Sequence, residues 1–155
     1  MNNLLLAIFA CFAFSAAGRL VVDDCSKPDS LLKELKIEYS PNPPVVGQML
    51  RSSITAYLEA AQVLAPVELK ITTFVNGVES PAPPAMTELC EEIKKRNGGV
   101  DVCPIFKGPF ELSYEAPYKV LPVGLTLQYE ATYQGSQLFC FNIRTEPELN
   151  LLQVQ

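Results

Sequence analysis

Apolar and polar residues alternate along most of the chain with a period of two. The alternation runs through residues 35–39, 50–58, 67–73, 110–115, 125–132 and 139–144. It is typical of strands that have one face in a core and one in water. Turn sequences separate the stretches, and Asn76-Gly77 is the strongest, because a type I′ hairpin turn needs positive φ at both central positions. The pattern predicts an all-β domain, an antiparallel β-sandwich of about seven short strands.

No segment has a convincing helical period. Residues 87–96 are compatible with one or two helical turns, but Gly98 and Gly99 follow at once. We interpret the charged residues among 91–96, which are Glu91, Glu92 and Lys94 to Arg96, as part of a solvated loop. The alternative is that the basic triplet Lys94 to Arg96 touches an anionic membrane, where each charge contributes about 1 kcal/mol.

The N-terminus differs from the rest of the chain. Residues 4–17 carry no charge and end in small residues, although no Lys or Arg precedes them. The run is too short to cross a bilayer, which takes about 20 apolar residues. We therefore predict a cleaved secretory signal peptide at residues 1–18 and one domain at residues 19–155. The alternative is a buried N-terminal helix, but the run has no polar face. The expected location is extracellular or in the endolysosomal or vacuolar lumen.

The cysteines form an even set once the predicted signal peptide is removed. Cys11 leaves with it, and Cys25, Cys90, Cys103 and Cys140 remain. In an oxidising compartment four cysteines predict two disulfides, which the residues alone leave open among three connectivities. A zinc site is the competing interpretation, but the sequence has neither CxxC spacing nor histidine.

Charge and composition disfavour several classes of function. The formal net charge is −5, whereas binding to a nucleic-acid backbone needs a basic surface. The absence of histidine removes mechanisms based on Ser-His or Cys-His pairs and on His-bound metals. Asp23 and Asp24 do not form an acid/base pair, because neighbours on a strand point to opposite faces. We expect neither an enzyme nor a metal or cofactor site.

The apolar strand positions fit either a filled core or a ligand cavity. A lipid cavity needs an apolar lining, because each buried CH₂ group contributes about 0.8 kcal/mol. The candidate lining residues are Leu58, Leu69, Ile71, Val75, Phe110, Tyr114, Leu125, Leu127, Tyr129, Phe139 and Phe141. Taken alone, these residues favour the filled core.

An ordered set of short motifs changes that balance. The set comprises Asp24-Cys25, Leu35-x-Ile37-x-x-Ser40-Pro41, Val75-Asn76-Gly77-Val78, Cys90, Cys103-Pro104-Ile105, Leu121-Pro122 and Leu138-Phe139-Cys140-Phe141. In this order, over residues 23–145, the chain resembles the ML lipid-recognition domain. It most resembles the Niemann-Pick type C2-like sterol carriers of that family.

The resemblance implies an immunoglobulin-like sandwich whose two sheets part to admit one lipid. It implies the disulfides Cys25–Cys140 and Cys90–Cys103, and it places Leu121 and Pro122 at the rim of the cavity. It also implies a monomeric carrier that touches membranes transiently, with a membrane transporter or receptor as a candidate further partner.

The sequence departs from the sterol carriers in two places. Residues 40–47 contain no cysteine, although those carriers usually have a third disulfide there, and this segment looks more like the phosphatidylglycerol/phosphatidylinositol transfer branch. The aromatic gate positions of the family are Ala82 and Leu121 here, which implies a wider mouth. We expect a sterol ligand, with a glycerophospholipid as the alternative. An alternative of another class is a secreted lipid-recognition module that acts through a protein receptor.

Overall fold

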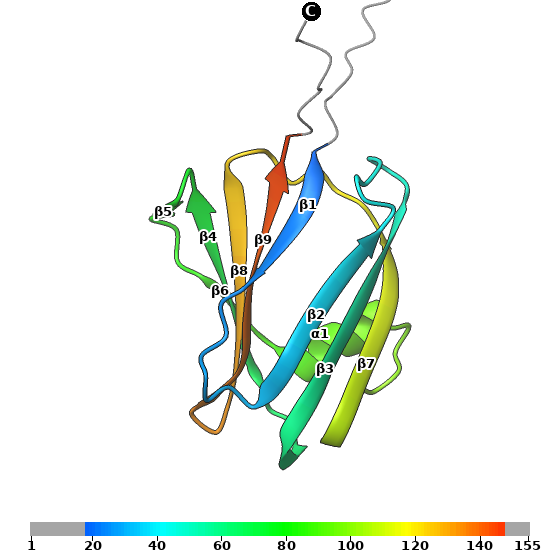
Figure 1. Cartoon of the computed structure of the whole chain (residues 1–155), viewed down its shortest axis with the longest axis vertical. Coiled ribbons are helices and arrows are strands. Elements are labelled where there is room, and N and C mark those ends of the chain that lie inside the picture. The colour runs from blue at the N-terminus through cyan, green and yellow to red at the C-terminus, as the bar shows by residue number, and fades with distance from the viewer. Residues whose placement is uncertain (1–17, 148–155) are drawn as a thin grey trace, which may run out of the picture.

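The computed structural model describes residues 18–147. Within this range nine strands form two antiparallel sheets (Figure 1). The larger sheet contains β1 (Arg19–Asp24), β9 (Ser136–Glu146), β8 (Leu125–Tyr133), β4 (Glu68–Val75) and β5 (Val78–Glu79) in that order, and β6 (Ala85–Glu88) also pairs with β4. The smaller sheet contains β2 (Leu32–Ser40), β3 (Met49–Val63) and β7 (Ile105–Pro117). The predicted all-β antiparallel sandwich is therefore confirmed.

The strands follow the alternating stretches, with additions at the sheet edges. The predicted hairpin at Asn76-Gly77 joins β4 to β5, and both residues have positive φ, 50° and 81°. Sequence periodicity did not predict β1, β5 or β6. Each has six residues or fewer, so it contains too few alternations to stand out.

The interpretation of residues 91–96 as a loop is wrong, because α1 (Leu89–Arg96) is a helix. The Glu88 side chain caps it by accepting a hydrogen bond from the Glu91 backbone N–H at 2.7 Å. Acidic residues occupy the first turn of α1 and basic residues the last, which complements the helix dipole. Local charge order therefore supports a helix that has too few apolar residues to show a period.

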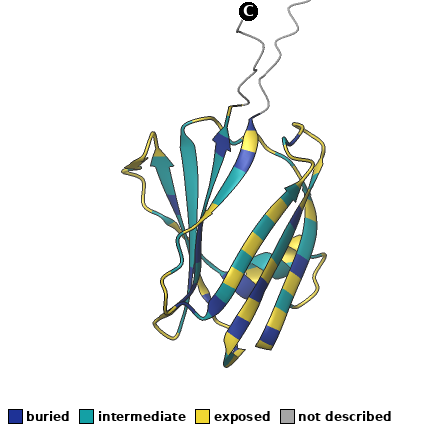
Figure 2. Ribbon diagram, viewed as in Figure 1, coloured by how far each residue is buried: buried dark blue, intermediate teal, exposed yellow. Residues whose placement is uncertain are grey.

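The two sheets pack tightly at one end and diverge toward the other (Figure 1). The tight end holds the fully buried side chains Leu58, Val63, Val67 and Leu138. Figure 2 shows alternating buried and exposed bands along β2, β3 and β7, whereas β8 is of intermediate burial along most of its length. This contrast indicates that the inner face of the larger sheet is not fully covered by the smaller one.

Two disulfides link segments outside the strands to the rest of the fold. Cys25 follows β1 and is bonded to Cys140 of β9. Cys90 of α1 is bonded to Cys103, which lies just before β7. This is the pairing that the resemblance implied. The second bond holds α1 across the gap between the two sheets. The predicted signal peptide lies outside the described residues except for Gly18, so it stays a prediction.

Candidate functional site

An apolar cavity of about 900 Å³ lies between the sheets. Its closed end is formed by buried residues of the tight end, among them Leu69, Leu89 and Leu138. From there it extends between the diverging sheets, and the inner faces of β2, β3 and β7 lie opposite those of β4, β8 and β9. This shape can surround a long apolar molecule.

The loops at the wide end form the mouth of the cavity. Residues 118–121 line it there, next to the loop of residues 41–48. The two loops are joined by backbone hydrogen bonds from Gly47 to Tyr118 and from Tyr118 to Gln48, at 3.2 and 2.9 Å. The Asn42 amide closes the adjacent edge, since it both donates to and accepts from the backbone of Leu20 in β1 at 2.9 Å.

Most of the predicted lining residues do line this cavity. They are Leu69, Ile71, Phe110, Tyr114, Leu121, Leu125, Leu127, Tyr129, Phe139 and Phe141. Within the lining, Phe141 stacks on Tyr129 with ring centroids 5.0 Å apart and on Phe139 at 5.4 Å. The strand faces that the sequence pattern assigned to the interior therefore meet around one space.

Three predicted lining residues lie elsewhere. Leu58 is fully buried in the tight end, where the sheets are too close to leave space. Val75 is the last residue of β4 and is 49% exposed beside the hairpin turn. Pro122 is exposed in the loop between β7 and β8. Ala82, at a gate position of the family, is also exposed and does not line the cavity. Alternation predicts which face of a strand a residue occupies, but not how far apart the sheets are at that position.

The structure adds polar lining residues that sequence reasoning missed. Tyr39 and Ser52 line the cavity from β2 and β3. Ser52 lies on the same face of β3 as the apolar residues Leu50 and Ile54, and it is buried. A serine on an otherwise apolar strand face is a signal that inspection of the sequence can find.

The helix α1 contributes two of the three charged residues that line the described cavity, and the third, Lys119, lies in a mouth loop. Glu92, Ile93 and Arg96 line the cavity from one side of the helix. Together with Leu89 they follow the helical spacing i, i+3, i+4 and i+7. Glu92 Oε1 accepts a hydrogen bond from Arg96 Nε at 3.0 Å and lies 2.9 Å from Arg96 Nη2. The cavity therefore has one ion pair in an apolar wall.

The electrostatics of this region keep its phenols neutral. Burial raises the pKa of Tyr39 well above its ordinary value, and nearby Tyr114 and Tyr129 add to the rise. Burial also raises the pKa of Tyr129, which Arg96 partly opposes. Burial alone lowers the pKa of the Arg96 guanidinium, but its hydrogen bond with Glu92 contributes to a net rise. The shifts move the pKa of Tyr39 and Tyr129 further from neutral pH, so both phenols stay protonated and can donate hydrogen bonds beside a charged guanidinium.

The arrangement suits binding more than bond chemistry. Among residues 18–147, no group of three or more His, Cys, Asp or Glu residues could hold a metal ion. No helix in the described part of the chain is long and apolar enough to cross a membrane. The four described cysteines are all in disulfides and so provide no thiol nucleophile.

Comparisons with known proteins agree with this geometry. A family model described as ML domain matches residues 19–146. The mite group 2 allergen Tyr p 2 of Tyrophagus putrescentiae is 26% identical in an alignment of 145 residues that covers 91% of this chain and 96% of the mite protein.

Two solved structures are also similar to this chain. Chicken MD-1 complexed with lipid IVa aligns with a TM-score of 0.56 and 16% identity, over 84% of this chain and 90% of MD-1. A Niemann-Pick type C2 protein from Japanese carpenter ant aligns with a TM-score of 0.49 and 19% identity, over 79% of this chain and 96% of the ant protein. At these identities the likeness to MD-1 concerns the fold.

Proposed function

The chain belongs to the ML domain family, and from this premise we propose that it binds one lipid and carries it through water between membranes. Proteins of this family are lipid-binding or carrier proteins and not enzymes. The observation that carries the proposal is the 900 Å³ apolar cavity with one closed end. The complex of chicken MD-1 with lipid IVa supports it, since that protein holds a lipid and has a similar fold.

The proposed mechanism is desolvation without covalent chemistry. A lipid leaves the membrane and enters the cavity through its mouth. Inside the cavity its apolar body contacts the inner strand faces and is shielded from water. Each CH₂ group transferred contributes about 0.8 kcal/mol, so a long apolar body is held firmly without any specific bond. The polar surface of the sandwich keeps the complex in solution.

A sterol is the proposed ligand, because the sequence motifs most resemble the Niemann-Pick type C2-like carriers. A glycerophospholipid is the second candidate. It is favoured by the cysteine-free segment 40–47 and by Leu121, which occupies an aromatic gate position at the cavity mouth.

Exposed apolar side chains surround the mouth. Val45, Val46, Met49, Val120 and Val123 are each 46–60% exposed, and all lie in or beside the two mouth loops. Such side chains insert readily into the boundary region of a membrane. We propose that this end of the protein touches the membrane while lipid is exchanged, and that a transporter or receptor receives the cargo.

The proposed location is extracellular or in an endolysosomal or vacuolar lumen. The two disulfides support it, because such bonds persist in oxidising compartments. We propose in addition that residues 1–18 are a signal peptide that is removed from a monomeric mature protein.

The test is to produce the protein through a secretory pathway, purify it without detergent and identify bound lipid by mass spectrometry. We expect one sterol per chain, and transfer of dehydroergosterol between vesicles without another protein. Stoichiometric phospholipid would favour the second candidate. Lipid binding without transfer would favour a recognition module that acts through a receptor, and the absence of any bound or transferred lipid would contradict the proposed function.

A further inference from the structure

A row of hydroxyl groups crosses the cavity wall on the smaller sheet. Ser52 of β3 pairs with Tyr39 of β2 on one side and with Tyr114 of β7 on the other, and all three line the cavity. The cross-strand row next to them toward the closed end is apolar and consists of Ile37, Ile54 and Leu112. The next row toward the mouth contributes only Leu50 and Ala116 to the lining. The hydroxyl row therefore separates two apolar levels of the cavity.

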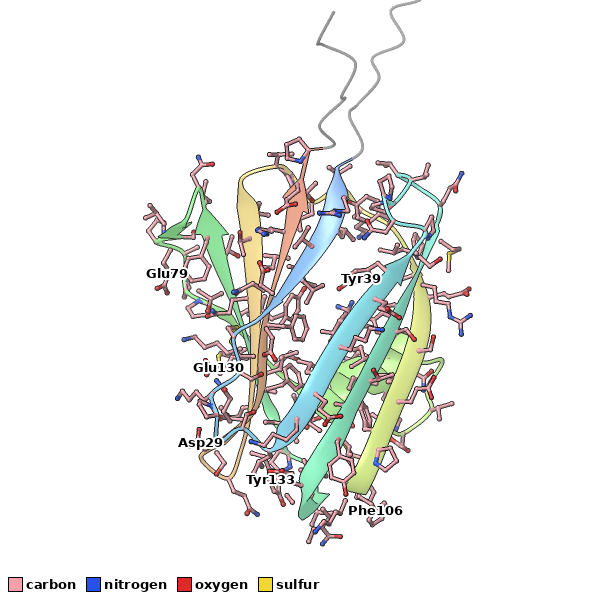
Figure 3. The ribbon with its side chains drawn as sticks, in the orientation of Figure 1. Asp29, Tyr39, Glu79, Phe106, Glu130 and Tyr133 are labelled. Atoms are coloured by element: carbon pink, nitrogen blue, oxygen red, sulfur yellow. A yellow bond between two sulfur atoms is a disulfide. The ribbon has the colours of Figure 1, made fainter. Side chains whose placement is uncertain are left out.

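This row lies near the mouth and not at the closed end. Tyr39 is next to the last residue of β2, where the chain enters the mouth loop 41–48 (Figure 3). Strand β7 runs in the same sense and ends at Pro117, three residues beyond Tyr114. A lipid whose apolar body reaches the closed end would thus bring its other end to the hydroxyl row.

The helix α1 brings Arg96 to the same level. The helix starts at buried Leu89, whose backbone N–H bonds to Val67 at the tight end, and Arg96 is its last residue. Arg96 and Tyr114 line both the cavity and a second hollow of about 400 Å³ on its outer side. Arg96 and Tyr114 therefore lie in the part of the cavity wall next to β7, an edge strand of the smaller sheet.

The groups in this row have unused donor capacity. Among the side-chain hydrogen bonds of the described residues, none involves the hydroxyls of Tyr39, Ser52 or Tyr114. A guanidinium has five N–H donors, and Glu92 engages Arg96 only through Nε and Nη2. Because these groups face the cavity, a group bound there can accept hydrogen bonds that the protein itself does not use.

We propose that Tyr39, Ser52, Tyr114 and Arg96 form the subsite for the polar head of the bound lipid, and that the subsite takes a compact oxygen head that accepts hydrogen bonds. Two lipid classes supply this chemistry, the hydroxyl of a sterol and the carboxylate of a fatty acid. The inference rests on the proposed lipid-binding function and adds the orientation of the ligand, with its head at the hydroxyl row and its apolar body toward the closed end.

The test uses two pairs of fluorescent ligands that differ only at the head. The first pair is dehydroergosterol and its acetate, and the second is cis-parinaric acid and its methyl ester. In at least one pair we expect the ligand with the free hydroxyl or carboxylate to bind about ten-fold more tightly than its ester. The added ester group blocks or crowds the hydrogen bonds between the ligand head and the subsite. Titration of the purified protein by ligand fluorescence measures all four affinities.

Removing single hydroxyls tests the row directly. Tyr39→Phe and Tyr114→Phe should each lower the affinity for the unesterified ligand by about three- to ten-fold. The affinity for the ester should change by less than about two-fold, since only a hydrogen bond is lost. The matched control is Tyr57→Phe, on the exposed face of β3, which should change neither affinity.

The ion pair separates the two ligand classes. For parinaric acid, Arg96→Gln should weaken binding about ten-fold, whereas Glu92→Gln should strengthen it about three-fold by freeing the guanidinium. Both substitutions break the same ion pair, so a disturbed helix cannot produce opposite signs. For dehydroergosterol the loss on Arg96→Gln should be only about two- to three-fold, because its hydroxyl is neutral. The control is Lys95→Gln, which lies on α1 outside the lining and should change neither affinity.

The outcomes separate this inference from the function on which it rests. Esters that bind as tightly as the free heads in both pairs would overturn the subsite while leaving lipid binding intact. So would tyrosine substitutions that weaken free and esterified ligands equally. Failure of all four ligands to bind would overturn the proposed function and the subsite with it.

Discussion

Thr126 and Leu127 are neighbours on β8, but their side chains point to opposite faces of the larger sheet. Leu127 lines the cavity, whereas Thr126 does not and pairs by register with Arg144 of β9. A difference of one residue in the sequence therefore decides whether a side chain faces the cavity or the opposite side of the sheet. This is the scale at which the period-two pattern has the most predictive power.

The two neighbours provide a matched test of the cavity. Leu127→Asp should abolish uptake of dehydroergosterol, because a carboxylate in the apolar lining must be desolvated when the lipid enters. Thr126→Asp should bind normally, since its carboxylate stays outside the cavity. Uptake is measured by fluorescence titration after circular dichroism has shown that both variants are folded. Normal uptake by a folded Leu127→Asp variant would contradict the assignment of this cavity as the lipid site.

Two glycines in turns differ in what surrounds them. Gly77 and Gly124 both have positive φ, 81° and 86°. A Cβ added to Gly77 would meet nothing within 4 Å, whereas one added to Gly124 would lie 2.5 Å from Asn76 Oδ1. Gly77→Ala should therefore lower the free energy of unfolding by about 1 kcal/mol, the cost of the left-handed backbone alone.

Gly124→Ala should lower the free energy of unfolding by more than Gly77→Ala, because the Asn76 side chain must also move. Urea denaturation of the two variants measures the difference. Equal losses would show that the contact between the two turns is relaxed at no cost.

At the scale of elements, α1 depends on one residue that bonds to two segments. The carboxylate of Glu88 accepts hydrogen bonds from the backbone N–H of Glu91 in the first turn and from that of Val67 before β4, both at 2.7 Å. Glu88 thus starts the helix and fixes it to the larger sheet. The helix in turn covers the edge between the two sheets and supplies Arg96 to the cavity.

Glu88→Ala should lower the free energy of unfolding by about 2 kcal/mol, because an N-cap and a second backbone hydrogen bond are lost together. The control Glu91→Ala removes a carboxylate from the same turn without removing a cap, and should cost less than about 1 kcal/mol. Urea denaturation compares the two. A loss for Glu88→Ala no larger than that of the control would mean that the cap contributes little to α1.

At the scale of the whole molecule, the two disulfides close loops of very different length. Cys25 and Cys140 are 115 residues apart in sequence, and Cys90 and Cys103 are 13 apart. The bond that closes the long loop links the first and last strands of the chain, β1 and β9, which are neighbours in the larger sheet. The short loop holds α1 beside β7, where the cavity wall carries its ion pair.

Replacing each pair by serine should destabilise the protein, and the loss should be larger for the pair that closes the longer loop. In the chain-entropy view the loss is about 3 kcal/mol for a loop of about 15 residues and about 4.7 kcal/mol for one of about 100. The Cys25→Ser/Cys140→Ser variant should therefore unfold at a lower urea concentration than the Cys90→Ser/Cys103→Ser variant. The reverse order would show that the short bond acts mainly through the packing of α1.

The sequence by itself determined the strand faces, the sandwich architecture and the Asn76-Gly77 hairpin. These features depend on local backbone geometry, in which a period of two or a pair of positive φ angles leaves a direct mark on residue choice. The disulfide pairing came from family resemblance, because residue spacing alone left three connectivities open.

Only the tertiary structure decided where the sheets separate. The distance between the sheets placed Leu58 in the core and Leu127 in the cavity lining, although both residues face the interior from their strands. It also brought Tyr39, Ser52 and Tyr114 into one row beside Arg96, from segments far apart in the chain. The physical reason is that alternation is a property of each strand alone, whereas the height and polarity of a cavity depend on strand register and on how the two sheets pack.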